Sequence, residues 1–170
     1  MRKKEIYTKS GDGGVTTTLS QINVPKDDSL VEAIGILDEL MVQLDKVIYG
    51  LNILPDMKRD LKNCVEIRKR LHILGGEISG KKDENDITDE DTTTIENNIS
   101  DVDADLEEFI DFSNPISIDV NELRVRIRKL ERFLTPHLRD GLISSSAYKY
   151  INRLSDYFFI LSVNIDETFK

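Results

Sequence analysis

The sequence has very few residues of the kinds that build disulfide frameworks, metal centres and aromatic cores. Its 170 residues include one cysteine, two histidines and no tryptophan, and aromatic residues make up only 6%. The single Cys64 excludes an internal disulfide, and His72 and His137 are too far apart to form a metal-ligand motif. We therefore expect a core of Leu, Ile and Val packed between helices.

Long hydrophobic runs are also missing. No apolar stretch approaches the roughly 20 residues that span a bilayer. The N-terminal MRKKEIYTK has no apolar segment after its basic residues, so it does not resemble a secretory signal. We expect one domain over residues 1–170, located in the cytoplasm and without membrane association.

Negative charge is abundant but unevenly distributed. The formal net charge is −9, and residues 81–108 alone contain twelve acidic and two basic side chains. Residues 121–153 contain eight basic and three acidic side chains. An acidic chain with one basic segment is unsuited to general nucleic-acid binding, but that segment can bind a small polyanion. We expect 81–108 to be a solvated outer helix that the chemistry does not need.

Apolar residues recur at helical spacing after residue 27. Ser29 and Glu32 match a capping box at the first helix start, and Pro136 is expected to stop the fourth helix. The predicted helices are about 29–49, about 55–79, one that begins at Thr88 and includes Val102, one from Val120 to Leu134, and about 144–166. Four or five helices of this kind predict an all-α antiparallel bundle over residues 28–170, preceded by an extended arm, residues 1–27.

The arm contains a glycine-rich stretch, KSGDGGVTTT, at residues 9–18. Gly11, Gly13 and Gly14 permit positive φ angles and close backbone approach, and successive N–H groups in such turns bind anions. Lys9 and the threonine hydroxyls add further donors. The stretch fits either a phosphate-binding turn or an ordinary hairpin. It is not a Walker A loop, because no Gly-Lys-Ser/Thr opens a helix here.

A strip of arginines is the second candidate site. Arg124, Arg128 and Arg132 recur every four residues, so they lie along one side of the predicted fourth helix. Guanidinium groups this close repel one another unless an anion lies among them, and Arg is well suited to phosphate. The alternative is a solvated face neutralised by Glu122 and Glu131. From the residues alone, binding of a polyanion, with Mg²⁺ on its phosphates, is the strongest interpretation.

Four ordered motifs together resemble the ATP:cob(I)alamin adenosyltransferases of the propanediol-utilisation type, the cobalamin adenosyltransferase family. They are YTKSGDGGVTTTL at 7–19, PKDD and VEAIGILDEL between Pro25 and Leu40, RVRIRKLER at 124–132, and YINRLSDYFF at 150–159. The resemblance implies a five-helix bundle that forms homotrimers and binds ATP between subunits. It also implies transfer of the 5′-deoxyadenosyl group of ATP to the cobalt of cob(I)alamin, which releases triphosphate and forms adenosylcobalamin.

The resemblance assigns ATP binding to the arm of one subunit and to the last two helices of its neighbour. The implied ATP-binding residues are Thr8, Lys9, Ser10, Gly11, Asp12, Gly14, Thr16, Thr17, Lys26, Arg128, Lys129, Glu131, Arg132 and Asn152. Mg²⁺ is expected on the ATP phosphates, with Glu131 as its candidate protein ligand. Arg128 is the implied catalytic cation. Asp38, at the edge of the apolar stripe, is expected to pair with Arg124 across the subunit interface.

The implied corrinoid-binding residues are Phe109, Phe112 and Asp156. Because cob(I)alamin is itself a strong nucleophile, no protein base is needed, which agrees with the missing catalytic triads. One of the two phenylalanines is expected to form an apolar wall that helps cobalt lose its lower axial ligand. The spacing favours Phe109, whereas a shifted loop favours Phe112.

The sequence departs from the family pattern on the corrinoid side. FIDFSNP, residues 109–115, is one residue shorter than the family's F-x-x-P-G-G, Asn121 replaces a His, and Lys129 replaces an Arg. An alternative is therefore an ATP-binding or corrinoid-delivery module with weak or no transferase activity. A purely structural trimer is disfavoured, because it has no use for the arm and the arginine strip. Further expected partners are a corrinoid reductase or an adenosylcobalamin-dependent enzyme.

Overall fold

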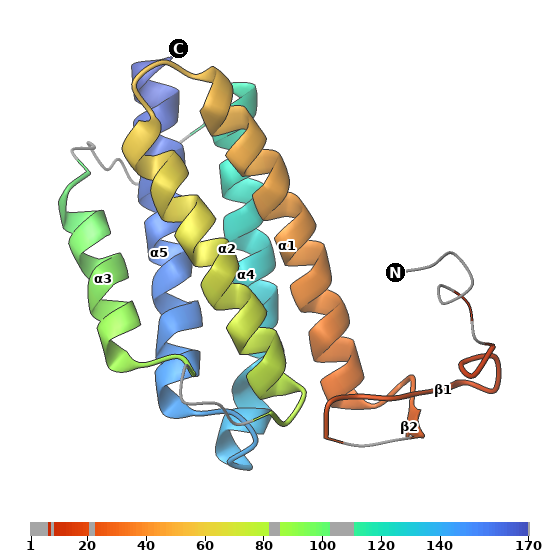
Figure 1. Cartoon of the computed structure of the whole chain (residues 1–170). Coiled ribbons are helices and arrows are strands. Elements are labelled where there is room, and N and C mark those ends of the chain that lie inside the picture. Colours follow the sequence, from red (N-terminus) through yellow and green to blue (C-terminus); the bar gives the residue numbers. More distant parts are fainter. Residues whose placement is uncertain (1–6, 8, 21–22, 82–85, 103–110, 170) are drawn as a thin grey trace.

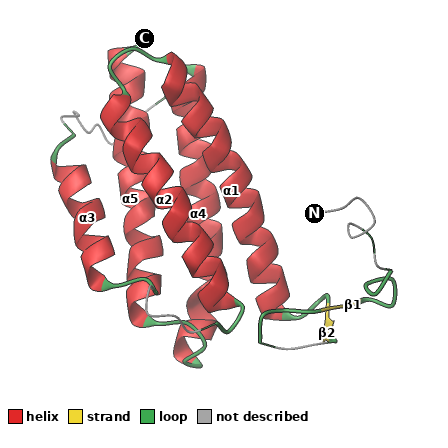
Figure 2. Cartoon of the chain, in the orientation of Figure 1, coloured by secondary structure: helices red, strands yellow, loops and turns green. Residues whose placement is uncertain are grey.

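The computed structural model describes residues 7, 9–20, 23–81, 86–102 and 111–169. Its helices are α1 (Ser29–Ile53), α2 (Lys58–Ile78), α3 (Asp89–Ser100), α4 (Pro115–Arg139) and α5 (Ser145–Thr168). Figure 1 shows consecutive helices running in opposite directions, with α1, α2, α4 and α5 as long rods and the shorter α3 at the edge. α1 packs against α2 and α4, and α5 packs against α4 and α3. The predicted all-α five-helix bundle is confirmed (Figure 2).

The N-terminus of α1 differs from the predicted capping box. Asp28 is the N-cap, and its Oδ1 accepts a hydrogen bond from the Leu30 N–H at 2.8 Å. Ser29 is the first helical residue, and its hydroxyl lies 3.0 Å from His137 Nε2. The prediction that Ser29 caps with Glu32 is therefore wrong by one position. Asp and Ser are equally good N-caps, so the pattern alone does not separate them.

The prediction that Pro136 stops the fourth helix is also wrong. α4 continues through it to Arg139, because a proline in the last turn removes only one hydrogen bond. Asp140 is the C-cap, and the next residue, Gly141, has a φ of 69°, a left-handed conformation that favours glycine. The Leu142 N–H closes this end by donating to the His137 carbonyl at 2.9 Å.

The arm contains two very short strands, β1 (Val15–Thr16) and β2 (Val24–Pro25), which the sequence pattern did not predict. They pair antiparallel, with Val15 opposite Pro25 and Thr16 opposite Val24. Figure 1 shows the arm projecting outward from the first turn of α1. The arm is therefore extended, as expected, but its base is pinned by a small β-bridge.

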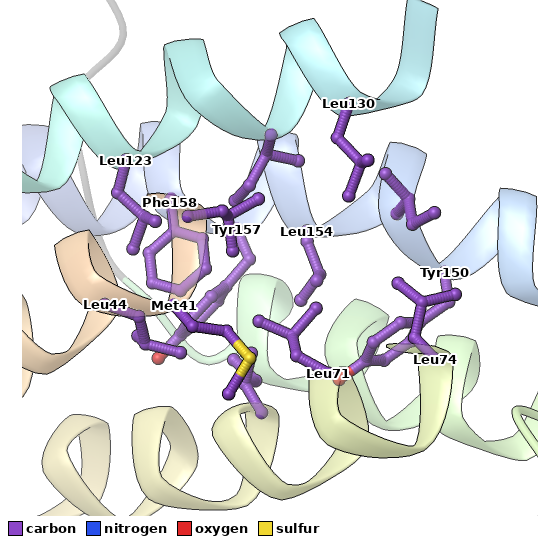
Figure 3. Close-up of a cluster of buried hydrophobic side chains, with 14 of the residues drawn as sticks. Met41, Leu44, Leu71, Leu74, Leu123, Leu130, Tyr150, Leu154, Tyr157 and Phe158 are labelled. Atoms are coloured by element: carbon purple, nitrogen blue, oxygen red, sulfur yellow. The ribbon is translucent and has the colours of Figure 1, made fainter. Parts of the chain in front are cut away.

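The core is aliphatic on α1, α2 and α4, and partly aromatic on α5. Figure 3 shows leucines of several helices meeting Tyr150, Tyr157 and Phe158, which are all at most 1% exposed. Burial raises the pKa of the Cys64 thiol, which is fully enclosed among them. None of the described helices is long and apolar enough to cross a membrane.

Glycines let α1 approach its neighbours closely. A Cβ atom on Gly50 would lie 3.1 Å from the Ile116 side chain of α4. A Cβ atom on Gly75 of α2 would lie 3.2 Å from Leu37 of α1. Gly50 is within α1, which runs four residues beyond the predicted end at Tyr49. This packing fixes α4 on α1 and leaves the other side of α4 to face α5.

Candidate functional site

The arginine strip lies where α4 faces α5. Arg124 of α4 donates from Nε to Asn121 Oδ1 at 2.7 Å. Its guanidinium carbon lies 5.6 Å from the centre of the Phe159 ring of α5, within the range of a cation–π interaction. Burial lowers the pKa of Arg124, and the positive charge of Arg128 lowers it further. This guanidinium is thus held in place by a neutral amide and an aromatic ring.

Arg128 and Arg132 continue the strip and are exposed. Among the residues that the structure describes, no carboxylate lies within ion-pair distance of either one. Glu122 instead accepts from Arg126 at 2.7 Å. Glu131 accepts from the Asn152 amide of α5, also at 2.7 Å. The alternative in which these two glutamates neutralise the strip is therefore wrong, and the strip retains positive charge for an anion.

Lys129 lies on the other side of α4. Its Nζ is 3.6 Å from Glu39 Oε2 of α1, and Arg126 contacts the same carboxylate at 3.2 Å. Within one chain Lys129 is thus paired and directed toward α1. The structure brings Glu131 and Asn152 together on the α5 side and leaves Lys129 apart from them.

The glycine-rich turn of the arm has the backbone conformation of an anion-binding loop. Lys9 and Gly14 have positive φ angles of 61° and 78°, and successive turns are closed by hydrogen bonds such as Gly14 N–H to the Gly11 carbonyl at 3.3 Å. Lys26 lies over this turn, since its Nζ would be 3.1 Å from a Cβ atom on Gly11. Lys26 has no described carboxylate partner, so its ammonium group is available to a ligand.

The other predicted arm residues lie on the same turn and strand. Thr8 is outside the described residues. The exposed ones are Lys9, Ser10, Asp12, Gly14 and Thr17, whereas Gly11 and Thr16 are half-buried. The arm therefore presents most of its predicted ligands to solvent.

Asp38 is exposed on α1 and lines a cavity of about 610 Å³ between α1 and α2. Leu19 of the arm, His72 and Gly76 line the same cavity. Arg124 faces α5 on the far side of α4, so the two predicted partners do not meet within one chain. If they pair, they must do so between chains.

On the predicted corrinoid side, the structure describes two of the three residues. Phe109 is outside the described residues, and Phe112 is half-buried just before α4. Asp156 is exposed and accepts from Arg153 at 2.6 Å, while Arg153 also donates to Glu96 of α3 at 3.1 Å. Asp156 therefore lies at the α3 edge of the face that carries Asn152.

The sequence did not predict the structural roles of three residues in this region. Asn121 and Phe159 hold Arg124, although Phe159 lay within a recognised motif. Asp166 is 2% exposed and binds the turn before α4. The available signal was an acidic residue in the last turn of a helix, where the helix dipole disfavours negative charge.

The described residues include no group of three His, Cys, Asp or Glu side chains that could hold a metal ion. The described site is therefore a positive face with hydrogen-bonding side chains. Such a face can bind a phosphorylated ligand and stabilise charge on it, which is catalysis by orientation and electrostatics.

Comparison with known proteins places these features in one family. The family model described as Cobalamin adenosyltransferase matches residues 6–165. The corrinoid adenosyltransferase of Citrobacter freundii is 34% identical, over 96% of this chain and 95% of that protein. The corrinoid adenosyltransferase of Bacillus subtilis (strain 168) is 28% identical, over 91% of this chain and 83% of that protein.

The fold is also similar to solved structures of PduO-type adenosyltransferases. A variant of the PduO-type ATP:co(I)rrinoid adenosyltransferase from Lactobacillus reuteri, complexed with ATP, has a TM-score of 0.81 at 25% identity, covering 95% of this chain and 94% of that chain. Another variant of the Lactobacillus reuteri protein, complexed with cobalamin and ATP, has a TM-score of 0.82 at 24% identity, covering 96% and 94%. The latter likeness shows the shared fold.

Proposed function

Because the chain belongs to the cobalamin adenosyltransferase family, we propose which of its residues carry the reaction. The chain is an ATP-dependent corrinoid adenosyltransferase: it transfers the 5′-deoxyadenosyl group of ATP to the cobalt of cob(I)alamin and releases triphosphate. The observation that supports the site assignment is the arginine strip of α4, which has no described anionic partner and adjoins the Glu131–Asn152 pair.

Arg128 and Arg132 bind the triphosphate of ATP. Their guanidinium groups are exposed and unpaired among the described residues, and a planar guanidinium can donate two parallel hydrogen bonds to a phosphate. The glycine-rich turn of the arm and Lys26 contribute backbone N–H groups and a further cation. Lys129 joins them only if ATP displaces its contact with Glu39.

The two halves of this ATP site come from different subunits. The arm leaves the bundle at α1 (Figure 1), whereas Arg124 of the strip faces α5. No hydrogen bond or ion pair joins the described arm residues to Arg128 or Arg132. A neighbouring subunit can supply the missing half. We infer a homotrimer with three such sites, in agreement with the resemblance of the motifs.

The outer face of α1 supports this assembly. Val42, Tyr49 and Ile53 are 71%, 71% and 64% exposed and lie along one side of the helix, together with Asp38. Exposed apolar side chains that line up in this way are typical of protein interfaces. Asp38 and Arg124 lie on different faces of the chain, as a head-to-tail contact in a closed ring requires. The Asp38–Arg124 pair is therefore proposed at the interface.

Magnesium is held mainly by the phosphates of ATP. Mg²⁺ typically binds one or two carboxylates together with phosphates and water, and Glu131 offers a carboxylate beside the strip on its α5 side. Its Oε1 accepts from Asn152, which leaves Oε2 without a described donor. Glu131 thus fits one position in the coordination of a phosphate-bound Mg²⁺.

The chemistry needs orientation more than proton transfer. The cobalt–carbon bond forms as the bond from C5′ to the triphosphate oxygen breaks, and the electron pair stays on that oxygen. Arg128 stabilises the negative charge that develops there. Phe109 or Phe112 forms the apolar wall against the corrin ring, and Asp156 lies near the polar edge of that substrate.

We further propose that the enzyme is cytoplasmic. A corrinoid reductase must supply the reduced substrate, and an adenosylcobalamin-dependent enzyme must receive the product.

The test is a direct assay of the full chain. The protein is incubated with ATP, Mg²⁺ and chemically reduced cobalamin, and the corrinoid absorption spectrum is followed. The expected result is conversion of the cob(I)alamin spectrum to that of adenosylcobalamin, with release of one triphosphate per corrinoid. ATP binding without spectral conversion would instead support the binding or delivery module.

A further inference from the structure

Asp166 connects the end of α5 to the turn that leads into α4. Its Oδ1 accepts hydrogen bonds from the Ser113 N–H at 2.7 Å, the Asn114 N–H at 2.8 Å and the Ser117 hydroxyl at 2.8 Å. The side chain is 2% exposed. The Ser113 hydroxyl adds a longer contact at 3.4 Å. Four donors thus converge on one buried carboxylate oxygen, and two of them are backbone groups of consecutive residues.

The same turn is held from its other side by Asn114. Its Oδ1 accepts from the Ile116 N–H at 2.8 Å and caps α4, while its Nδ2 donates to the Phe169 carbonyl at 2.9 Å. The turn is therefore tied to the C-terminal end of α5 by side chains of both partners. A carboxylate near a helix C-terminus is disfavoured by the dipole of that helix. Here the charge lies against the N-terminus of α4, which favours it.

This arrangement fixes the backbone directly beside Phe112. Ser113 follows Phe112, so the first hydrogen bond to Asp166 restrains the peptide group that joins them. Phe112 is half-buried and belongs to the stretch expected to contact the corrin ring. Misplacement of a positioning group by about 1 Å can reduce an enzymatic rate about 100-fold.

We propose that Asp166 is a positioning residue for the corrinoid substrate, an inference that rests on the proposed function. It holds the turn at 111–114 so that the apolar wall stays rigid against the corrin ring. The arginine strip of α4 is separate from the turn that Asp166 holds. Arg128 lies about 20 Å along α4 from the first helical residue, at 1.5 Å per residue. Disturbing the turn should therefore affect the corrinoid and spare ATP.

The variant for the test is Asp166→Asn, which keeps the shape and removes the charge. The matched control is Glu167→Gln, which removes a charge from the neighbouring, exposed position in the same turn of α5. Ser117→Ala removes only one of the four donors and serves as a milder variant if Asp166→Asn folds poorly. Hydrogen exchange at the Ser113 and Asn114 amides and Michaelis constants for ATP and cobalamin are measured for each.

In Asp166→Asn we expect exchange at both amides to be at least about ten-fold faster, because hydrogen bonds to a charged acceptor are the stronger ones. Corrinoid turnover should fall about ten-fold or more with loss of the four-coordinate cob(II)alamin signal, while the Michaelis constant for ATP changes less than about two-fold. Ser117→Ala should show the same pattern more weakly, and Glu167→Gln should show neither effect.

Two results separate the inference from the proposed function. The positioning role alone is overturned if the wild type is active and Asp166→Asn behaves like Glu167→Gln. It is also overturned if Asp166→Asn weakens the binding of ATP as much as it lowers corrinoid turnover. A wild-type chain that binds ATP but never adenosylates cobalamin overturns the proposed function and, with it, this role.

Discussion

Asn152 of α5 donates from Nδ2 to Glu131 Oε1 of α4 at 2.7 Å, beside the arginine strip. This bond orients the Glu131 carboxylate toward the positive face and leaves its second oxygen for a cation. Glu131→Gln keeps the amide-to-oxygen hydrogen bond and removes the charge. We expect the Mg²⁺ concentration for half-maximal activity to rise about ten-fold or more, as for the loss of groups that support a metal site. An unchanged Mg²⁺ requirement in a titration would restrict Glu131 to positioning Asn152.

Asp38 should matter only in the assembled enzyme. It is exposed in the single chain and makes no described ion pair there, so Asp38→Asn should have little effect on one bundle. If the trimer buries it against Arg124, losing one partner of a buried pair costs about 3–5 kcal/mol. Sedimentation should then show monomers or weakened trimers.

Asp45→Asn is the matched control, because Asp45 is exposed on the same helix but pairs with Arg68 within the chain. A trimer of normal thermal stability in Asp38→Asn would remove this pair from the interface.

The attachment of α3 to α5 should depend on pH. Asp89 accepts from the Ser146 hydroxyl at 2.8 Å and from Lys149, and these contacts lower its pKa. A carboxylate whose pKa is lowered in the folded state stabilises that state at pH values above its unfolded-state pKa of about 3.9. This stabilisation is lost as the pH falls through the folded-state pKa. The protection factors of the α3 amides against hydrogen exchange should fall below about pH 4 in the wild type. Asp89→Asn should show the lower protection factors already at neutral pH.

The acidic segment should still be dispensable for the chemistry. Asp89 and Glu90 lie in the first turn of α3, which packs against α5. Neutralising them together with Asp83 and Glu84, which are outside the described residues, removes negative charge from this segment. The Michaelis constant for ATP should change less than about two-fold, since exposed charges this far apart are screened by salt. A large increase measured at physiological ionic strength would mean that this segment contributes to the ATP site.

Helical periodicity was sufficient to predict the bundle, and it failed where two local rules compete. Asp28 and Ser29 are adjacent residues with the same capping preference, so only the tertiary contact of Ser29 with His137 decides between them. Pro136 breaks a helix in general, but here it falls within the last turn. The arginine spacing predicted a strip, yet it could not show that Glu122 and Glu131 are bonded elsewhere. The position of Asp166 in the last turn of a helix marked it as unusual, but its partners could not be predicted, because they lie about 50 residues away and no local pattern encodes them.

Arg128 should act mainly in the transition state. Negative charge grows on the bridging triphosphate oxygen as cobalt attacks C5′, and an unpaired guanidinium stabilises it most at that point. Arg128→Ala should lower turnover about 100-fold or more. Arg128→Lys should recover only part of it, because an ammonium group lacks the planar fork. Arg126→Ala, which changes an arginine that faces α1 and is paired with Glu122 and Glu39, is the control. Equal losses in both variants, measured by corrinoid spectroscopy, would indicate a general effect on α4.

Loss of the phenylalanine wall should affect the corrinoid substrate and not ATP, unlike loss of Arg128. Phe109→Ala removes an apolar side chain and no charge, so the Michaelis constant for ATP should stay unchanged. Water or the lower ligand should then reach the cobalt, slowing transfer and removing the four-coordinate signal from the cob(II)alamin spectrum. Phe112→Ala is the comparison, since the stretch at 109–115 is one residue shorter than the family pattern. If only Phe112→Ala shows this phenotype, the wall is Phe112 and the shortened loop shifts it. If both variants keep the signal and full activity, neither ring forms the wall, and the assignment of these two residues to the corrinoid site is wrong.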